Sequence, residues 1–314
     1  MASHFTPDRA FRGGPAGIGE ENWFAGATSL FRRRYQADPT GADIAILGLP
    51  FDQAVSNRPG ARFGPRAIRA ASSNLAWPGG PWRWPFDPFA RLDVVDTGDF
   101  AYDTGDPGAF APALEAHAAA LIATGARLLA LGGDHFTTYP LLKAHAARHG
   151  PLGLVQFDSH SDTWREPARR IDHGTMFFHA LEEGIIDPAR SVQIGIRSGN
   201  TETHGMTIID ADTVADETPA ALAQRIRNAV GGGPLYLTFD IDFLDPAYAP
   251  GTGTPVCGGP STGKAERILV GLAGLNFVGM DLVEVSPPYD HAEITALAGA
   301  TMALDMIGLF ASRA

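Results

Sequence analysis

The stretch Leu-Gly-Leu-Val-Gln-Phe-Asp-Ser-His-Ser-Asp at residues 152–162 joins an apolar run to a cluster of metal-ligating side chains. Its first six residues are mostly apolar, as in a strand that is buried on both faces. In extended chain alternate residues share a face, so Asp158, His160 and Asp162 are expected to converge on one point. Two carboxylates and an imidazole at the end of a buried strand are costly unless a cation neutralises them. This stretch therefore predicts a metal centre at the end of a core strand.

Seven further apolar runs have the character of short buried strands, and they lie at 43–49, 92–95, 128–131, 192–196, 207–209, 235–239 and 277–283. Helix-like segments lie between most of them, at 111–124, 137–149, 219–230 and 264–272, and Ser261 or Thr262 can cap the last of these. Strands that alternate with helices predict a parallel sheet covered on both faces. We expect one doubly wound α/β domain over residues 36–314 after an N-terminal arm at 1–35, with a closed eight-stranded barrel as the competing architecture.

Composition narrows the class of partner. The 314-residue chain is 45% hydrophobic and 19% charged, as in an ordinary globular protein, and its formal net charge is −11. That charge argues against nucleic acid and suits a small cationic ligand. The basic segment Phe-Arg-Arg-Arg-Tyr at 31–35 is interpreted as solvated surface or a subunit contact.

Location is constrained by two further observations. Cys257 is the only cysteine, which excludes an intramolecular disulfide and fits a reducing cytoplasm. The N-terminus has no basic-then-apolar signal pattern, and we expect no apolar run of membrane-spanning length. The Gly-, Pro- and Arg-rich loop at 57–69 is either a tight turn that leads into a helix or the rim of a site or interface.

The remaining ligands are expected just after other strands, because sites in parallel architectures form at the carboxyl ends of strands. Gly-Gly-Asp-His at 132–135 follows one run, and Asp-Ile-Asp at 240–242 follows another. The combined candidate set contains four carboxylates and two imidazoles, and it consists of His135, Asp158, His160, Asp162, Asp240 and Asp242. Six ligands are too many for one tetrahedral zinc, whereas four negative charges balance two divalent cations.

A hard, oxygen-rich ligand set without sulfur favours two Mn²⁺ ions, although zinc, cobalt or nickel could occupy the same site in vitro. Two close divalent ions can hold a bridging water and lower its pKa, so the expected reaction class is hydrolysis.

These motifs resemble the three metal motifs of the arginase/agmatinase (ureohydrolase) family. The resemblance continues through Asp-His-Gly-Thr-Met-Phe at 172–177, Pro-Gly-Thr-Gly-Thr-Pro at 250–255 and the segment 283–295, and it covers residues 43–310 in order. Within the family the likeness is greatest to the bacterial agmatinases, which remove urea from agmatine and leave putrescine. The resemblance implies an eight-stranded doubly wound parallel sheet rather than a barrel, and a homotrimer or homohexamer.

The resemblance also implies roles for particular residues. Asp158 and Asp240 would bridge the two Mn²⁺ ions, with His135 and Asp162 completing one ion's shell and His160 and Asp242 completing the other. The second set of implied residues concerns the substrate: His173 as proton shuttle, Glu284 as partner of the substrate guanidinium, and Thr254 near that guanidinium.

The sequence departs from the family pattern at two places. Ser159 and Ser161 replace the usual Ala and Thr, and as intervening residues they are expected to point away from the metals. Arginases place an Asn shortly after the Asp-x-His-x-Asp motif, where this chain has residues 163–165, Thr-Trp-Arg, which argues against arginine as the substrate.

Three arginines in the following loop, Arg165, Arg169 and Arg170, keep a second substrate class open. They could meet the carboxylate of 4-guanidinobutyrate or 3-guanidinopropionate, and they would repel the ammonium of agmatine. Two further alternatives are a binuclear metallophosphatase, for which the chain lacks a Gly-Asn-His segment, and a catalytically silent family member, against which the intact ligand set argues.

Overall fold

The computed structural model describes residues 8, 10, 24–76, 80–165 and 170–314. In this part of the chain eight strands form one sheet: β1 Ile44–Leu49, β2 Val94–Asp99, β3 Arg127–Gly132, β4 Gly153–Phe157, β5 Val192–Ile196, β6 Thr207–Asp210, β7 Leu235–Asp240 and β8 Phe277–Val283. All neighbours are parallel, in the order β2-β1-β3-β8-β7-β4-β5-β6. The sheet is open, with β2 and β6 at its edges, so the doubly wound prediction is confirmed and the barrel is excluded.

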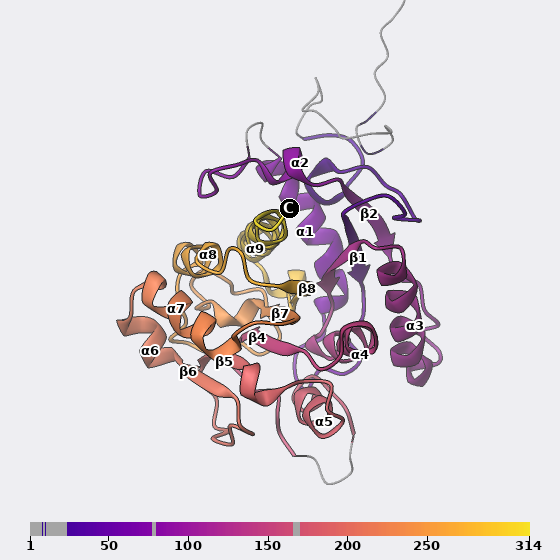
Figure 1. Cartoon of the computed structure of the whole chain (residues 1–314). Coiled ribbons are helices and arrows are strands. Elements are labelled where there is room, and N and C mark those ends of the chain that lie inside the picture. The colour runs from indigo at the N-terminus through magenta and orange to yellow at the C-terminus, as the bar shows by residue number, and fades with distance from the viewer. Residues whose placement is uncertain (1–7, 9, 11–23, 77–79, 166–169) are drawn as a thin grey trace, which may run out of the picture.

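Helices cover both faces of the sheet and make three layers (Figure 1). One face carries α1 Gly64–Ser72, α2 Pro88–Arg91, α6 Ala211–Asp216, α7 Pro219–Val230, α8 Thr262–Val270 and α9 Ile294–Ala311. The other face carries α3 Phe110–Ala123, α4 Thr138–His149 and α5 Met176–Glu182. Each face has its own apolar core, and the strand residues alternate between the two cores. The Ser261 side chain caps α8 by accepting from the Lys264 backbone N–H, as predicted.

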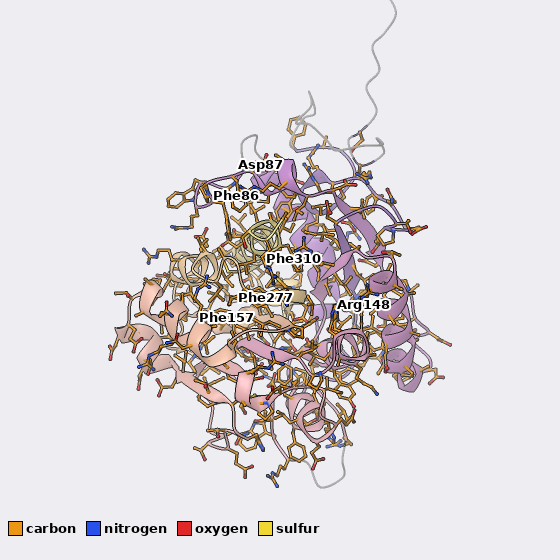
Figure 2. The ribbon with its side chains drawn as sticks, in the orientation of Figure 1. Phe86, Asp87, Arg148, Phe157, Phe277 and Phe310 are labelled. Carbon is orange, nitrogen blue, oxygen red and sulfur yellow. The ribbon has the colours of Figure 1, made fainter. Side chains whose placement is uncertain are left out.

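Strand register brings distant parts of the sequence to one edge of the sheet. Phe157 in β4 pairs with Phe239 in β7, and their rings stack with centroids 5.3 Å apart (Figure 2 labels Phe157). Each of these phenylalanines immediately precedes a predicted ligand, Asp158 or Asp240. Asp240 in turn pairs with Val283 of β8, so Glu284 follows one residue beyond. The core pairing therefore places the predicted site residues side by side at the carboxyl ends of four adjacent strands.

The C-terminal helix α9 corrects one expectation from the sequence. Its 18 residues have a mean hydropathy of 1.7, so by length and composition it could cross a membrane, and it is the one helix of the described chain that could. In the fold 83% of this segment is buried. A helix that is apolar on all sides is typical of the core of a large domain, and α9 has that place here.

The basic segment at 31–35 is another correction. Arg32 and Arg33 are only 7% exposed, so they are not solvated surface. The Arg33 guanidinium lies 4.3 Å from the centre of the Phe89 ring, and Arg34 forms an ion pair with Asp93. Most of the predicted N-terminal arm lies outside the described residues.

The loop at 57–69 is both a tight turn that leads into a helix and a neighbour of the predicted site segment 250–255. It turns at Gly60 (φ 143°), whose N–H donates to Asp52, and leads into α1, where Arg69 forms an ion pair with the buried carboxylate of Asp96. On its other side the Asn57 side-chain amide donates to the Gly253 carbonyl at 3.3 Å, which joins the loop to the segment 250–255.

Candidate metal centre

All six predicted ligands lie together at the carboxyl ends of β3, β4 and β7. His135 is at the centre of the first group. Its Nδ1 is 3.1 Å from Asp158 Oδ2, 2.9 Å from Asp162 Oδ2 and 3.3 Å from Asp240 Oδ2. These atoms come from three strand ends, and they leave Nδ1 facing only carboxylate oxygens.

A second group shares one residue with the first. His160 Nδ1 is 3.1 Å from Asp242 Oδ2 and 3.5 Å from Asp158 Oδ1. Asp158 thus turns one oxygen to each group, as a carboxylate that bridges two ions must. The carboxylate of Asp240 lies close to the ligand atoms of the first group but is not part of the second.

The local backbone differs from the extended chain that the alternating pattern predicted. β4 ends at Phe157, the following residues form a bend, and Asp162 has a left-handed backbone (φ 51°). After β7 the residues Ile241–Phe243 form a 3₁₀ turn. The side chains converge as expected, but turns bring them together rather than a shared strand face. Glu284, just after β8, is also left-handed (φ 64°), and such strain is typical of functional sites.

The donor set fits divalent cations. The four aspartates are at most 6% exposed, and His135 is 1% exposed. His135 Nε2 lies 2.8 Å from Thr238 Oγ1, so the tautomer with hydrogen on Nε2 donates to Thr238 and turns the Nδ1 lone pair toward the three carboxylates. A ring nitrogen that faces three buried carboxylates needs a positive charge beside it, which either a proton on Nδ1 or a metal ion supplies. Oxygen ligands with imidazole suit Mn²⁺ among the divalent ions.

The pKa values of side chains in the cluster reflect the same excess of negative charge. Burial alone lowers the pKa of His160, but the charges of Asp242 and Asp158 outweigh it and raise this pKa to about 12. Burial and the adjacent Asp158 carboxylate raise the pKa of Asp162 to about 6. Protons therefore bind this cluster strongly, and any metal ion has to displace them.

Glu284 and His173 form a pair beside the metal ligands. His173 Nδ1 is 3.2 Å from Glu284 Oε1, which also accepts from the His135 backbone N–H at 2.9 Å. Glu284 is 1% exposed, and its other oxygen, Oε2, has no hydrogen-bond partner within the described residues. An unsatisfied buried carboxylate oxygen is costly, so it points to a missing donor.

His173 has neighbours that favour opposite protonation states. Burial lowers its pKa, but hydrogen bonding and charge from Glu284 outweigh this and raise the pKa to about 9. On the other side His173 Nε2 lies 2.9 Å from the Ser56 backbone nitrogen and 2.8 Å from the Ser56 hydroxyl oxygen. The neutral ring can accept from the backbone N–H through Nε2, whereas the imidazolium can donate from Nε2 to the hydroxyl. Such a group is suited to both taking and giving a proton near neutral pH.

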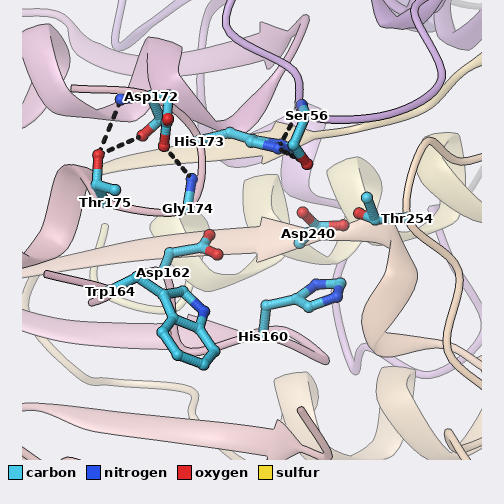
Figure 3. A pocket seen from close by; sticks show the side chains of 10 residues that line it. All are labelled: Ser56, His160, Asp162, Trp164, Asp172, His173, Gly174, Thr175, Asp240 and Thr254. Carbon is cyan, nitrogen blue, oxygen red and sulfur yellow. Dashed lines mark hydrogen bonds between the residues drawn. The ribbon is translucent and has the colours of Figure 1, made fainter. Parts of the chain in front are cut away.

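A pocket of about 240 Å³ opens above these groups (Figure 3). Its inner part is lined by the metal-centre residues His160, Asp162 and Asp240, with His173 and Thr254 beside them. The Thr254 hydroxyl is 3.3 Å from Asp242 Oδ2, so this predicted residue lies at the site.

The sequence left open whether the three arginines of the loop after the metal motif face the pocket. Arg165 and Arg170 are not among the residues that line the pocket. The Arg165 side chain is 65% exposed and pairs with Glu202 at 3.1 Å. Arg169 lies outside the described residues. Of the three, those that the structure places do not present a cation to a substrate carboxylate.

Several supporting residues were missed by the sequence analysis. Ser159 does not point away from the centre as expected: its hydroxyl donates to Asp242 Oδ1 at 2.7 Å. Gln156 Nε2 donates to Asp158 Oδ2 at 2.8 Å. A signal for Gln156 and Thr238 was present, since each is a polar residue inside an otherwise apolar strand. Arg197, whose guanidinium donates to the carbonyls of Asp242 and Val256, gave no such signal.

An open parallel sheet with two ligand groups at its carboxyl edge defines an α/β protein with a candidate two-ion centre. The chain belongs to the arginase family, whose model matches residues 42–308, and it is a ureohydrolase, a hydrolase of C–N bonds.

Three known proteins illustrate the relationship. An agmatinase from Proteus mirabilis is 53% identical over 283 residues, which cover 90% of this chain and 92% of the relative. The crystal structure of a hypothetical agmatinase from Burkholderia thailandensis has a TM-score of 0.95 at 48% identity and covers 98% of both chains. Proclavaminate amidino hydrolase from Streptomyces clavuligerus has a TM-score of 0.87 at 37% identity, covering 94% of this chain and all of the other.

Proposed function

We propose that this enzyme is a binuclear manganese hydrolase that cleaves the guanidinium of agmatine to give urea and putrescine. The agmatinase relatives at about half identity support this substrate, and the contents of the pocket support it independently. The observation that carries the proposal is the unpartnered Oε2 of Glu284, a buried carboxylate oxygen next to six clustered metal ligands.

The metal ligands in this proposal are the six residues of the cluster. His135 and Asp162 would hold one ion and His160 and Asp242 the other, with Asp158 and Asp240 shared between the two. When bound, the two ions polarise water and supply a nucleophile near neutral pH. The support from geometry is strongest for Asp158, which offers one oxygen to each group. Gln156 and Ser159 hold the carboxylates of Asp158 and Asp242 in place by hydrogen bonds.

Glu284 orients the substrate. A guanidinium is planar and presents N–H groups in a fork that a carboxylate can bind. Oε1 is held by the His135 backbone N–H, which leaves Oε2 as the acceptor. A Cβ at Gly253 would lie 3.5 Å from Oε2, so the glycine keeps the space beside that oxygen open. Fixing the cation in this way holds its carbon in position for attack.

His173 supplies the proton that the leaving amine requires. Glu284 stabilises the imidazolium through Nδ1, whereas the Ser56 backbone N–H stabilises the neutral ring through Nε2. After the His173 imidazolium gives its proton to the amine, the neutral ring is still hydrogen-bonded. The raised pKa of His173 then favours uptake of another proton by the ring. Thr254, at the edge of the pocket, is proposed as a further contact of the guanidinium.

The alternative of a guanidino-acid substrate loses support, because Arg165 pairs with Glu202 and lines no part of the pocket. The test is steady-state kinetics of the manganese-loaded enzyme on agmatine, 4-guanidinobutyrate, 3-guanidinopropionate and arginine. We expect the highest kcat/KM for agmatine. A higher value for either guanidino acid would replace agmatine as the assigned substrate.

Three further expectations belong to this proposal. We propose a homotrimer or homohexamer, which light scattering of the purified protein tests directly. We also propose a cytoplasmic location, in keeping with the single cysteine, which fractionation of the source cell would check. The proposed division into an arm at 1–35 and a catalytic domain at 36–314 is tested by removing the arm and measuring kcat/KM.

A further inference from the structure

The pocket has two chemically different ends (Figure 3). The inner end is formed by the metal ligands and lies beside His173. The opposite end is formed by Trp164, Asp172, Gly174 and Thr175, to none of which the family resemblance assigned a role. Among the residues that the structure describes, Asp172 is the one charged side chain that lines this outer end, so a ligand that spans the pocket meets a carboxylate there.

The carboxylate of Asp172 is held in position by its own loop. Its Oδ1 accepts from the Gly174 backbone N–H at 3.0 Å, and its backbone N–H donates to Thr175 Oγ1 at 2.9 Å. The Asp172 carbonyl accepts from the Met176 backbone N–H at 3.2 Å, which ties the loop to the start of α5. Oδ2 has no hydrogen-bond partner among the residues that the structure describes, so half of this fixed carboxylate is available to a ligand.

Trp164 provides an aromatic surface at the same end of the pocket. Its backbone N–H donates to the Gly174 carbonyl at 3.1 Å, so the loops that carry Trp164 and Asp172 are joined. The side chain is 48% exposed, and part of the indole faces the pocket. Tryptophan is the aromatic side chain that attracts cations most strongly. A carboxylate and an indole together favour a positively charged group.

Charge at the two ends is complementary to one kind of molecule. The inner end is lined by three carboxylate or imidazole ligands and by His173, and the buried Glu284 carboxylate lies 3.2 Å behind His173 Nδ1. The outer end carries the Asp172 carboxylate. No lysine or arginine lines the described pocket, so a carboxylate at the outer end of a ligand would have no partner. A linear dication satisfies both ends, whereas a zwitterion satisfies one.

We propose that Asp172 and Trp164 form a subsite for a primary ammonium group and that this subsite selects an amine-terminated guanidine over a carboxylate-terminated one. The inference rests on the proposed function, because it assigns the far end of the same substrate. It makes Asp172 a specificity-determining residue, since its charge acts on the end of the substrate remote from the reacting carbon.

The test compares Asp172→Asn with the native enzyme on agmatine and on n-butylguanidine, which lacks the ammonium. The variant removes the charge but keeps an oxygen for the Gly174 N–H. We expect kcat/KM for agmatine to fall about 10- to 100-fold relative to n-butylguanidine, mainly through KM, as for loss of a charged hydrogen bond. Relative kcat/KM for 4-guanidinobutyrate is expected to rise.

Glu202→Gln is the matched control. It also removes one carboxylate, but Glu202 is 57% exposed and lies outside the pocket lining, so the agmatine preference should not change. Trp164→Leu is a second variant at the subsite, for which we expect a loss of about 3- to 10-fold in the same preference. An equal loss on agmatine and n-butylguanidine in both subsite variants would overturn the inference while leaving the agmatine assignment in place.

Calorimetry with 1,4-diaminobutane separates failure of the subsite from failure of the proposed function, because it does not depend on turnover. We expect Asp172→Asn to weaken diamine binding by about the factor seen in the kinetics, and Glu202→Gln to leave it unaltered. If the native enzyme binds the diamine through Asp172 but hydrolyses no guanidine, the reaction assignment fails and the subsite stands. If diamine binding is the same in Asp172→Asn, the subsite fails.

Discussion

The two ends of the central sheet carry opposite charge for different physical reasons. At the carboxyl end, buried aspartates from β4 and β7 lie within hydrogen-bond range of His135. At the amino end a cavity of about 370 Å³ is lined by Arg127, Arg148, His149 and Arg313.

Local structure explains the basic end. Arg148 and His149 lie in the last turn of α4, and Arg127 donates to the Phe310 carbonyl at the end of α9 (Figure 2 labels Arg148 and Phe310). Cations are stabilised at helix C-termini, and Arg148 and His149 are exposed to solvent besides. The four buried carboxylates of the acidic end receive hydrogen bonds, such as those from Gln156 and Ser159, but within the described residues no lysine or arginine forms an ion pair with them. Helix C-termini account for the positive charge at the amino end of the sheet, whereas they do not account for the aspartates at the carboxyl end. The aspartate cluster therefore marks the candidate functional site.

The largest effect is expected from the shared ligand. Asp158→Ala removes the carboxylate that faces both groups, so neither ion keeps its full set of ligands. We expect metal content well below one ion per chain and a loss of activity of at least about 10³-fold. Elemental analysis of protein purified with Mn²⁺ gives the metal content. Full occupancy in this variant would mean that the acidic end is not organised around Asp158.

A smaller loss is expected from a change at His173, the proposed proton carrier. His173→Ala removes no ligand, so both ions should remain, while kcat falls about 10²- to 10⁴-fold. The same elemental analysis run beside Asp158→Ala distinguishes the two residues. If both variants lose metal equally, His173 has no separate role in proton transfer.

Metal binding at the acidic end should also depend on pH, because bound protons have to leave the cluster. Because the pKa of His160 is raised to about 12 in the metal-free cluster, the ring is protonated at neutral pH and must lose that proton to bind a metal ion. Manganese affinity should therefore rise with pH, about tenfold per unit for each proton released. Calorimetric titrations with Mn²⁺ at pH 6.5 and 8, in buffers of different ionisation enthalpy, measure the affinity and the number of protons released. Affinity that is independent of pH would show that no proton is displaced.

The smallest effect is expected at the basic end. Arg148→Ser removes an exposed cation from the last turn of α4 and should change the free energy of unfolding by about 0.5 kcal/mol or less. Its kcat/KM on agmatine should stay within about twofold of the native value. Urea denaturation and kinetics give the two numbers. A strong loss of activity would mean that the amino end of the sheet takes part in function and would remove the contrast between the ends.

Much of this protein could be predicted from the order of residue types. Runs of apolar, β-branched residues gave all eight strands within a few residues, because a strand buried on both faces has to be apolar throughout. The candidate metal ligands could be picked out for the same reason: Asp158 and Asp240 directly follow such runs, where an unpaired carboxylate is costly. The helix α9 was missed because it is apolar on every side and so has no amphipathic period to detect.

Only the tertiary structure decided which strand ends meet. The order β3-β8-β7-β4 places the ends of the third, fourth, seventh and eighth strands in one row, and no local pattern contains that order. It also showed that Ser159 binds Asp242 and that Arg165 turns away from the pocket, since side-chain direction depends on turns with left-handed residues such as Asp162. The sequence by itself determined the strands and the chemistry at their ends. The assembly of those ends into a pocket, with His173 backed by Glu284 at one end and Asp172 at the other, depends on contacts between residues that are far apart in the chain.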